Sequence, residues 1–144
     1  MSIFELMLKC CLLFFLGGAA WIDYQKKELP LIFIAVGFGL GLLLRILSGT
    51  AHPLEILPGF LPGILCLLIA KLSKEAIGYG DAFMLIAIGT FCLITELLFL
   101  LLCGFLIAGT VSILLLVLKK RNKKEEIPLI PFLLSGYVFT LPFF

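Results

Sequence analysis

The sequence predicts an all-α integral membrane protein, a bundle of six transmembrane helices in which residues 1–144 form a single polytopic domain. Hydrophobic residues make up 62% of the chain and charged residues only 14%, whereas a soluble domain is nearer half apolar and a quarter charged. The apolar residues also lie in consecutive runs, each able to cross a hydrocarbon core of about 30 Å. Six such crossings use nearly the whole chain, so we expect no separate soluble domain.

Breaks between the apolar runs predict spans at residues 3–22, 30–47, 54–70, 82–95, 97–118 and 128–144. Short polar or proline-containing segments separate the first three spans, and a cation-rich segment precedes the sixth. The fourth and fifth spans are interrupted by a single charge, Glu96, in a stretch about twice as long as one crossing needs. We therefore expect a tight turn near Thr95 and Glu96.

The cations are distributed unevenly among the connections. Nine of the eleven follow the first, third and fifth spans: Lys26, Lys27, Lys71, Lys74, Lys119, Lys120, Arg121, Lys123 and Lys124. The even-numbered connections carry only Arg45, His52 and Glu96. The positive-inside rule then predicts that the odd-numbered connections are cytosolic and that both termini lie outside.

Composition also bears on partners and cofactors. The net charge of +2 is small and reports orientation, so we expect the lipid bilayer as a partner and no nucleic acid. The five cysteines show no CxxC spacing, and His52 is the only histidine, so we expect no metal site. The glycine pairs Gly37/Gly41 and Gly59/Gly63 predict close helix contacts within the bundle, with a homodimer face as the alternative.

The chain contains only two aspartates, and both stand at the boundary of a span. Asp23 closes the first span and Asp81 opens the fourth. Two crossings separate them, so both lie on one face of the membrane, which the lysine count makes cytosolic. Ionisable groups at this position are costly and mark function by default, although an interfacial residue or a helix N-cap is the structural alternative for each, especially for Asp81.

Two carboxyl groups that approach within a few Å cannot both ionise easily, so they share one proton. The ionised group can then draw a proton from a water molecule while the protonated group supports the carbonyl oxygen of a peptide bond. Such a pair hydrolyses an amide without a metal or a cofactor. The sequence around Asp81 favours this interpretation, because Gly78 and Gly80 allow a tight turn and the close approach of another chain.

An aspartate that closes the first span and a GxGD string that opens the fourth resemble the type IV prepilin peptidases, the bacterial branch of the GxGD aspartyl proteases. Leu29-Pro30-Leu31 is similar to that family's Ile-Pro-Asn string, and Gly89 matches a glycine eight residues after the second aspartate. The segment from Pro128 to Gly136 resembles its final Pro, Phe-Leu and Gly pattern. The resemblance covers about residues 18–136.

The resemblance implies an intramembrane aspartic endopeptidase of the short, peptidase-only form. Asp23 and Asp81 would be catalytic, with supporting or substrate-binding residues at Gly78, Tyr79, Gly80, Pro30 and Tyr24. Tyr24 and Tyr79 are equally explained as interfacial anchors. Leu31 and Phe83 depart from the family pattern, which has asparagine and often lysine at these positions.

The substrate implied by the resemblance is the leader of a pilin-like precursor of a type IV pilus or a protein secretion system. Cleavage would occur at the cytosolic border of the bacterial inner (cytoplasmic) membrane. Three alternatives remain: a small transporter or channel subunit, in which the aspartates relay protons or bind a cation; a membrane scaffold; and the presenilin branch of the GxGD proteases. The last fits poorly, because a Pro-Ala-Leu string is absent.

Overall fold

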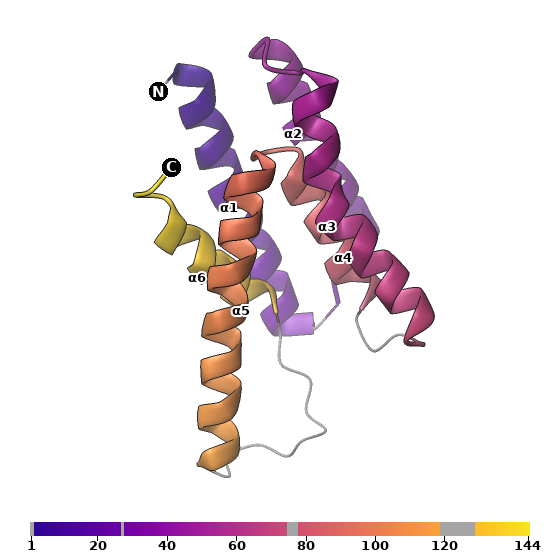
Figure 1. Cartoon of the computed structure of the whole chain (residues 1–144), viewed down its shortest axis with the longest axis vertical. Coiled ribbons are helices and arrows are strands. Elements are labelled where there is room, and N and C mark those ends of the chain that lie inside the picture. The colour runs from indigo at the N-terminus through magenta and orange to yellow at the C-terminus, as the bar shows by residue number, and fades with distance from the viewer. Residues whose placement is uncertain (1, 27, 75–77, 119–128) are drawn as a thin grey trace.

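A computed structural model describes residues 2–26, 28–74, 78–118 and 129–144 of the chain (Figure 1). These residues form six helices: α1 (Ile3–Lys26), α2 (Leu31–Leu47), α3 (Pro53–Leu72), α4 (Tyr79–Gly89), α5 (Ile94–Val117) and α6 (Ile130–Thr140). The all-α class and the number of helices predicted from the sequence are confirmed within this described part.

The predicted boundaries are wrong for the fourth helix. The span predicted at residues 82–95 is a helix of 11 residues, α4, which begins earlier and ends at Gly89. The turn to α5 lies at residues 90–93, and Glu96 belongs to the first turn of α5. The Thr90 hydroxyl donates to the Ala87 carbonyl, 2.7 Å away, which satisfies a carbonyl at the end of α4.

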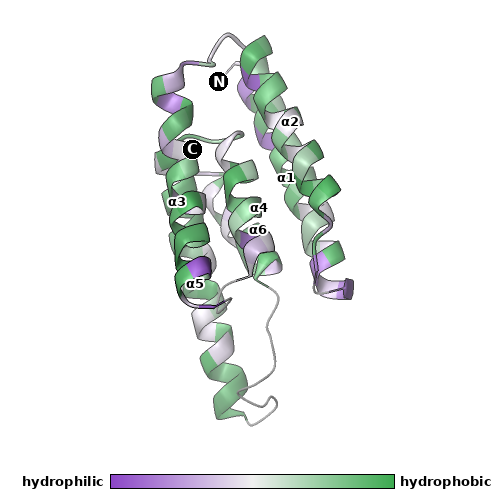
Figure 2. Cartoon of the chain, turned by 90° about the vertical axis from the view of Figure 1, so that its right-hand side faces the viewer, coloured by the Kyte–Doolittle hydropathy of each residue, from purple (hydrophilic) through white to green (hydrophobic). Residues whose placement is uncertain are grey.

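Three helices, α1, α3 and α5, are long and apolar enough to cross a membrane, whereas α2, α4 and α6 are shorter apolar helices. Figure 2 shows hydrophobic residues along most of the length of the helices. Many large apolar side chains face outward, among them Phe14, which is 80% exposed, and Leu54, which is 87% exposed. Such a surface suits lipid rather than water, so the chain is a membrane protein.

The helices pack as two groups of three. In the first triad α6 packs extensively against both α5 and α1, and in the second triad α4 packs extensively against both α3 and α2. Contacts between the triads are fewer and run mainly through α1 with α2 and α3 with α5. Because Asp23 lies on α1 and Asp81 on α4, each triad carries one aspartate.

Glycines set the closest approaches inside each triad. Gly59 of α3 lies so near the Gly89 carbonyl of α4 that a Cβ atom on Gly59 would stand 2.7 Å from that oxygen. A Cβ atom on Gly136 of α6 would meet the backbone nitrogen of Gly104, on α5, at 2.7 Å. Between the triads, Gly37 of α2 faces the ring of Phe15 on α1. The prediction that the glycine pairs mediate packing within the bundle is confirmed, and a homodimer is not tested.

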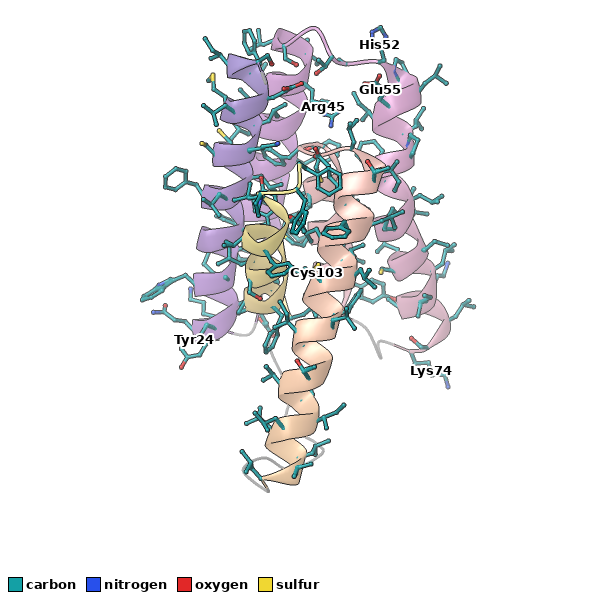
Figure 3. All side chains as sticks on the ribbon, turned by 60° about the vertical axis from the view of Figure 1, so that its left-hand side comes forward. Tyr24, Arg45, His52, Glu55, Lys74 and Cys103 are labelled. Carbon is teal, nitrogen blue, oxygen red and sulfur yellow. The ribbon has the colours of Figure 1, made fainter. Side chains whose placement is uncertain are left out.

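The bundle has two distinct polar ends. Figure 3 shows Tyr24 and Lys74 at one end, which we call the aspartate end because Asp23 closes α1 there and Asp81 opens α4 there. Arg45 and His52 lie at the opposite end, which we call the arginine end. The cations predicted to mark the third odd-numbered connection, at residues 119–124, and Lys27 fall outside the described residues, as does Pro128.

Candidate active site

Asp23 lies in the last turn of α1, and its residue is only 7% exposed. The backbone N–H of Ile130, the first residue of α6, donates to its Oδ2 atom across a long hydrogen bond of 3.4 Å. A carboxylate near the C-terminus of its own helix faces the negative end of the helix dipole and cannot act there as an N-cap. Asp23 therefore contributes nothing to the stability of α1 as a capping residue.

Asp81 is the third residue of α4 and is partly buried. Its position in the first turn suits the helix dipole. The N-cap of α4 is nevertheless Gly78, and no side chain forms a capping hydrogen bond at this helix terminus. The prediction that Asp81 could be the N-cap of its helix is thus wrong, because its carboxyl group does not bind the free N–H groups of the first turn.

The carboxyl groups of Asp23 and Asp81 lie near enough to one another for the charge on Asp23 to act on Asp81. They approach from different helices and from different triads. Asp23 stands in the last turn of α1 and Asp81 in the first turn of α4, so both acids lie at the aspartate end of the bundle. Two like charges in a partly buried setting cost free energy unless one of them is neutralised by a proton.

The glycines before Asp81 do not serve the turn that the sequence suggested. Gly78 has φ −63° and ψ 135°, an ordinary extended conformation. Among the described glycines only Gly49 has a positive φ angle. A Cβ atom on Gly80 would meet nothing within 4 Å, and one on Gly78 would meet only the Asp81 Oδ2 atom, at 3.7 Å. The backbone beside Asp81 is thus open on its outer side.

The other sequence-predicted supporting residues lie around this end of the bundle. Tyr79 is 39% exposed on the first turn of α4, beside the open backbone. Pro30 is exposed and forms the N-cap of α2, where its carbonyl accepts from the N–H of Phe33 at 3.0 Å. Tyr24 is 74% exposed and points away from the bundle (Figure 3), which supports its interpretation as an interfacial anchor.

Two groups near the aspartates were missed by the sequence analysis. The backbone N–H of Ile130 has no sequence signature, since every non-proline residue carries one. Cys66 of α3 lies close enough to Asp81 to feel its charge, although its position in an apolar run suggested only a packing role. In the described part of the chain, no three His, Cys, Asp or Glu side chains gather in a way that could hold a metal ion.

Comparison with known proteins identifies the family. The sequence model of the type IV leader peptidase family matches residues 10–113, which is well over half of the chain and includes both aspartates. No curated protein and no solved structure matches the chain. The chain therefore belongs to the type IV leader peptidase family, the aspartic-type prepilin peptidases.

Proposed function

We propose that Asp23 and Asp81 are the catalytic pair of this peptidase and that they cleave the leader of a pilin-like precursor by activating water. The observation that carries the proposal is that the only two aspartates of the chain lie at the same end of the bundle, on separate triads, near enough for the charge on Asp23 to act on Asp81. Neither carboxyl group caps the helix that carries it, so capping of α1 or α4 does not account for their positions.

The mechanism follows from a pair that shares one proton. The ionised carboxylate accepts a proton from a water molecule held between the two groups, while the protonated carboxyl donates a hydrogen bond to the carbonyl oxygen of the scissile peptide. The oxygen of that water forms a bond to the carbonyl carbon. Collapse of the tetrahedral intermediate breaks the C–N bond, and the leaving nitrogen takes a proton from the pair, which returns to its starting state.

A peptide needs access to the pair, and the start of α4 offers it. Gly78 is exposed, and both Gly78 and Gly80 leave open space where a side chain would otherwise stand. An extended leader can therefore lie against this backbone and bring its scissile carbonyl toward Asp81. Tyr79 is 39% exposed next to this path and can contact the bound chain.

For the membrane arrangement, we propose that all six helices lie in the bacterial inner membrane with the aspartate end facing the cytosol. Lys26, Lys71 and Lys74 stand at this end, as the positive-inside rule requires. Helices of 11 residues such as α4 and α6 extend only about 16 Å. They reach partway across the hydrocarbon core. Non-helical backbone at this depth is tolerated where it is buried in protein and not exposed to lipid.

The test is cleavage of a pilin-type precursor by the purified protein in detergent micelles. Asp23→Asn and Asp81→Asn keep the size of each side chain but cannot ionise, so each variant is expected to lose cleavage while remaining folded. Glu96→Gln is the matched control, because it neutralises an acid on α5 far from the pair, and it should cut like the wild-type protein. Cleavage at the normal rate by either aspartate variant would show that the two-carboxylate mechanism is wrong.

A further inference from the structure

Helix α6 begins directly beside Asp23. The first four N–H groups of any α-helix have no partner within the helix, so the N–H of Ile130 is a free donor unless something else accepts from it. Here the acceptor is the Asp23 carboxylate, in an environment where Ile130 is fully buried and Asp23 nearly so. The positive end of the α6 dipole thus faces a carboxylate that its own helix disfavours.

Helix α6 is also held firmly in this position. Gly136 packs against the backbone of Gly104 in α5, and the Leu133 side chain covers the same glycine. Toward the other end of α6, the Tyr137 hydroxyl donates to the Lys9 carbonyl of α1 at 3.1 Å. Helix α6 is therefore packed against α5 and bonded to α1 at Tyr137, so helix packing sets the position of its first N–H.

We infer that α6 is a positioning element of the active site: the Ile130 N–H holds the Asp23 carboxylate in its orientation toward Asp81 and favours the ionised form of the pair. An N–H group can only donate, so its bond is strongest when the carboxylate carries the charge. The inference rests on the proposed function. It concerns a part of the chain that lies outside residues 10–113, the range matched by the family.

The direct test replaces the Ile130 amide by an ester, using the α-hydroxy analogue of isoleucine in the full-length protein. The ester keeps the side chain but removes the N–H donor. We expect kcat to fall roughly tenfold, as is typical when a hydrogen bond to a charged group is lost, with KM changed less than about twofold. The acid limb of the kcat/KM profile should move to higher pH, because the ionised pair has lost a stabilising donor.

Two matched variants separate positioning from general damage. Ile130→Val keeps the N–H donor and shortens only the buried side chain, so the acid limb of its kcat/KM profile should not move. An ester at Phe139, in the last turn of α6, removes a helical N–H bond far from Asp23 and should leave the acid limb in place. Unchanged kcat and an unchanged acid limb in the Ile130 ester variant would overturn the inference.

A second measurement follows the Ile130 amide by NMR in the wild-type protein. With ¹⁵N-labelled isoleucine in micelles, the Ile130 amide signal, assigned by its absence in Ile130→Val, should shift with pH over the range in which activity changes. The shift should vanish in Asp23→Asn. A flat signal in an active wild-type protein overturns the positioning role and leaves the proposed function standing. Wild-type protein that cuts no leader, or an Asp23→Asn variant that still cuts, overturns the proposed function instead.

Discussion

The two polar ends of the bundle use their charged groups differently. At the arginine end, Arg45 is 4% exposed and its Nε–H donates to the Thr90 carbonyl at 3.0 Å, just past the end of α4. The Lys9 ammonium donates to the carbonyl of Phe144, and the Lys9 carbonyl accepts from Tyr137. Each of these contacts joins one helix to another segment of the chain. These polar contacts therefore stabilise the packing of the helices.

At the aspartate end, the charged groups have fewer hydrogen-bond partners. Asp23 accepts one long hydrogen bond, no hydrogen bond of the Asp81 side chain is seen among the described residues, and the two groups bear the same charge. Burial of like charges costs stability unless the pair shares a proton. A cation whose N–H groups are bound by backbone carbonyls serves the structure, whereas two nearby acids that together accept one long hydrogen bond are the candidates for chemistry.

The largest expected effect is the loss of catalysis when Asp81 is replaced, which tests whether the aspartate end serves chemistry. Asp81→Asn should lower kcat by a factor of roughly 10² to 10⁴, the range typical for loss of a general acid or base. The same variant should unfold no earlier than the wild-type protein on heating in micelles, because removal of one charge relieves repulsion in the pair. A variant that is inactive only because it unfolds early would place Asp81 among the structural residues.

The next effect concerns the packing that places Asp81. Gly59→Ala puts a methyl group against the Gly89 carbonyl, so α3 and α4 must move apart. We expect a destabilisation of about 1–3 kcal/mol, the usual cost of overpacking, measured by unfolding in mixed micelles.

Gly39→Ala is the matched control for this change, because Gly39 also lies within a helix but has open space around it. It should be neutral or slightly stabilising, since alanine is the better helix former. Equal losses in the two variants would mean that the close contact of α3 with α4 is unimportant for stability.

A loss of stability of about the same size is expected at the arginine end. Arg45→Met keeps an apolar stem of similar length and removes the donor to the Thr90 carbonyl. The loss should be about 1.5–3 kcal/mol of stability, the range for a hydrogen bond to a charged group. Cleavage per folded molecule should stay within about twofold of wild type. A large loss of activity in a stable Arg45→Met protein would contradict the structural role given to this end.

The smallest effect is predicted for Tyr137→Phe, which removes the bond to the Lys9 carbonyl and leaves the ring in place. A neutral hydrogen bond contributes about 0.5–1.5 kcal/mol, and unfolding in mixed micelles should register a loss of that size. An unchanged midpoint would show that this bond does not hold α6 against α1.

Much of this arrangement could be predicted from the sequence. Hydropathy indicated six helices, and parity alone placed Asp23 and Asp81 at the same end of the bundle, where the last turn of α1 and the first turn of α4 carry them. The end of α4 could not be predicted, because residues 82–95 contain no break in hydropathy. Tertiary contacts terminate that helix: Gly89 meets Gly59, and Arg45 binds the carbonyl of Thr90.

The contact of α6 with Asp23 could not be predicted from the sequence either. A backbone N–H leaves no mark on composition or periodicity, and its partner lies 107 residues away in the chain. The backbone conformation of the glycines in the GxGD string also differed from the prediction. Neither Gly78 nor Gly80 has the positive φ angle of a glycine turn, whereas the backbone there is open, so the role of these glycines in binding another chain stays a prediction.

The most direct test of the central claim is a cross-link between the two acidic positions. In a protein whose five native cysteines are replaced by serine or alanine, Asp23→Cys combined with Asp81→Cys should be joined in good yield by a short thiol-specific cross-linker, as detected by mass spectrometry. Asp23→Cys combined with Glu96→Cys should not be joined. If the second pair is linked and the first is not, Asp23 and Asp81 do not meet at one end of the bundle.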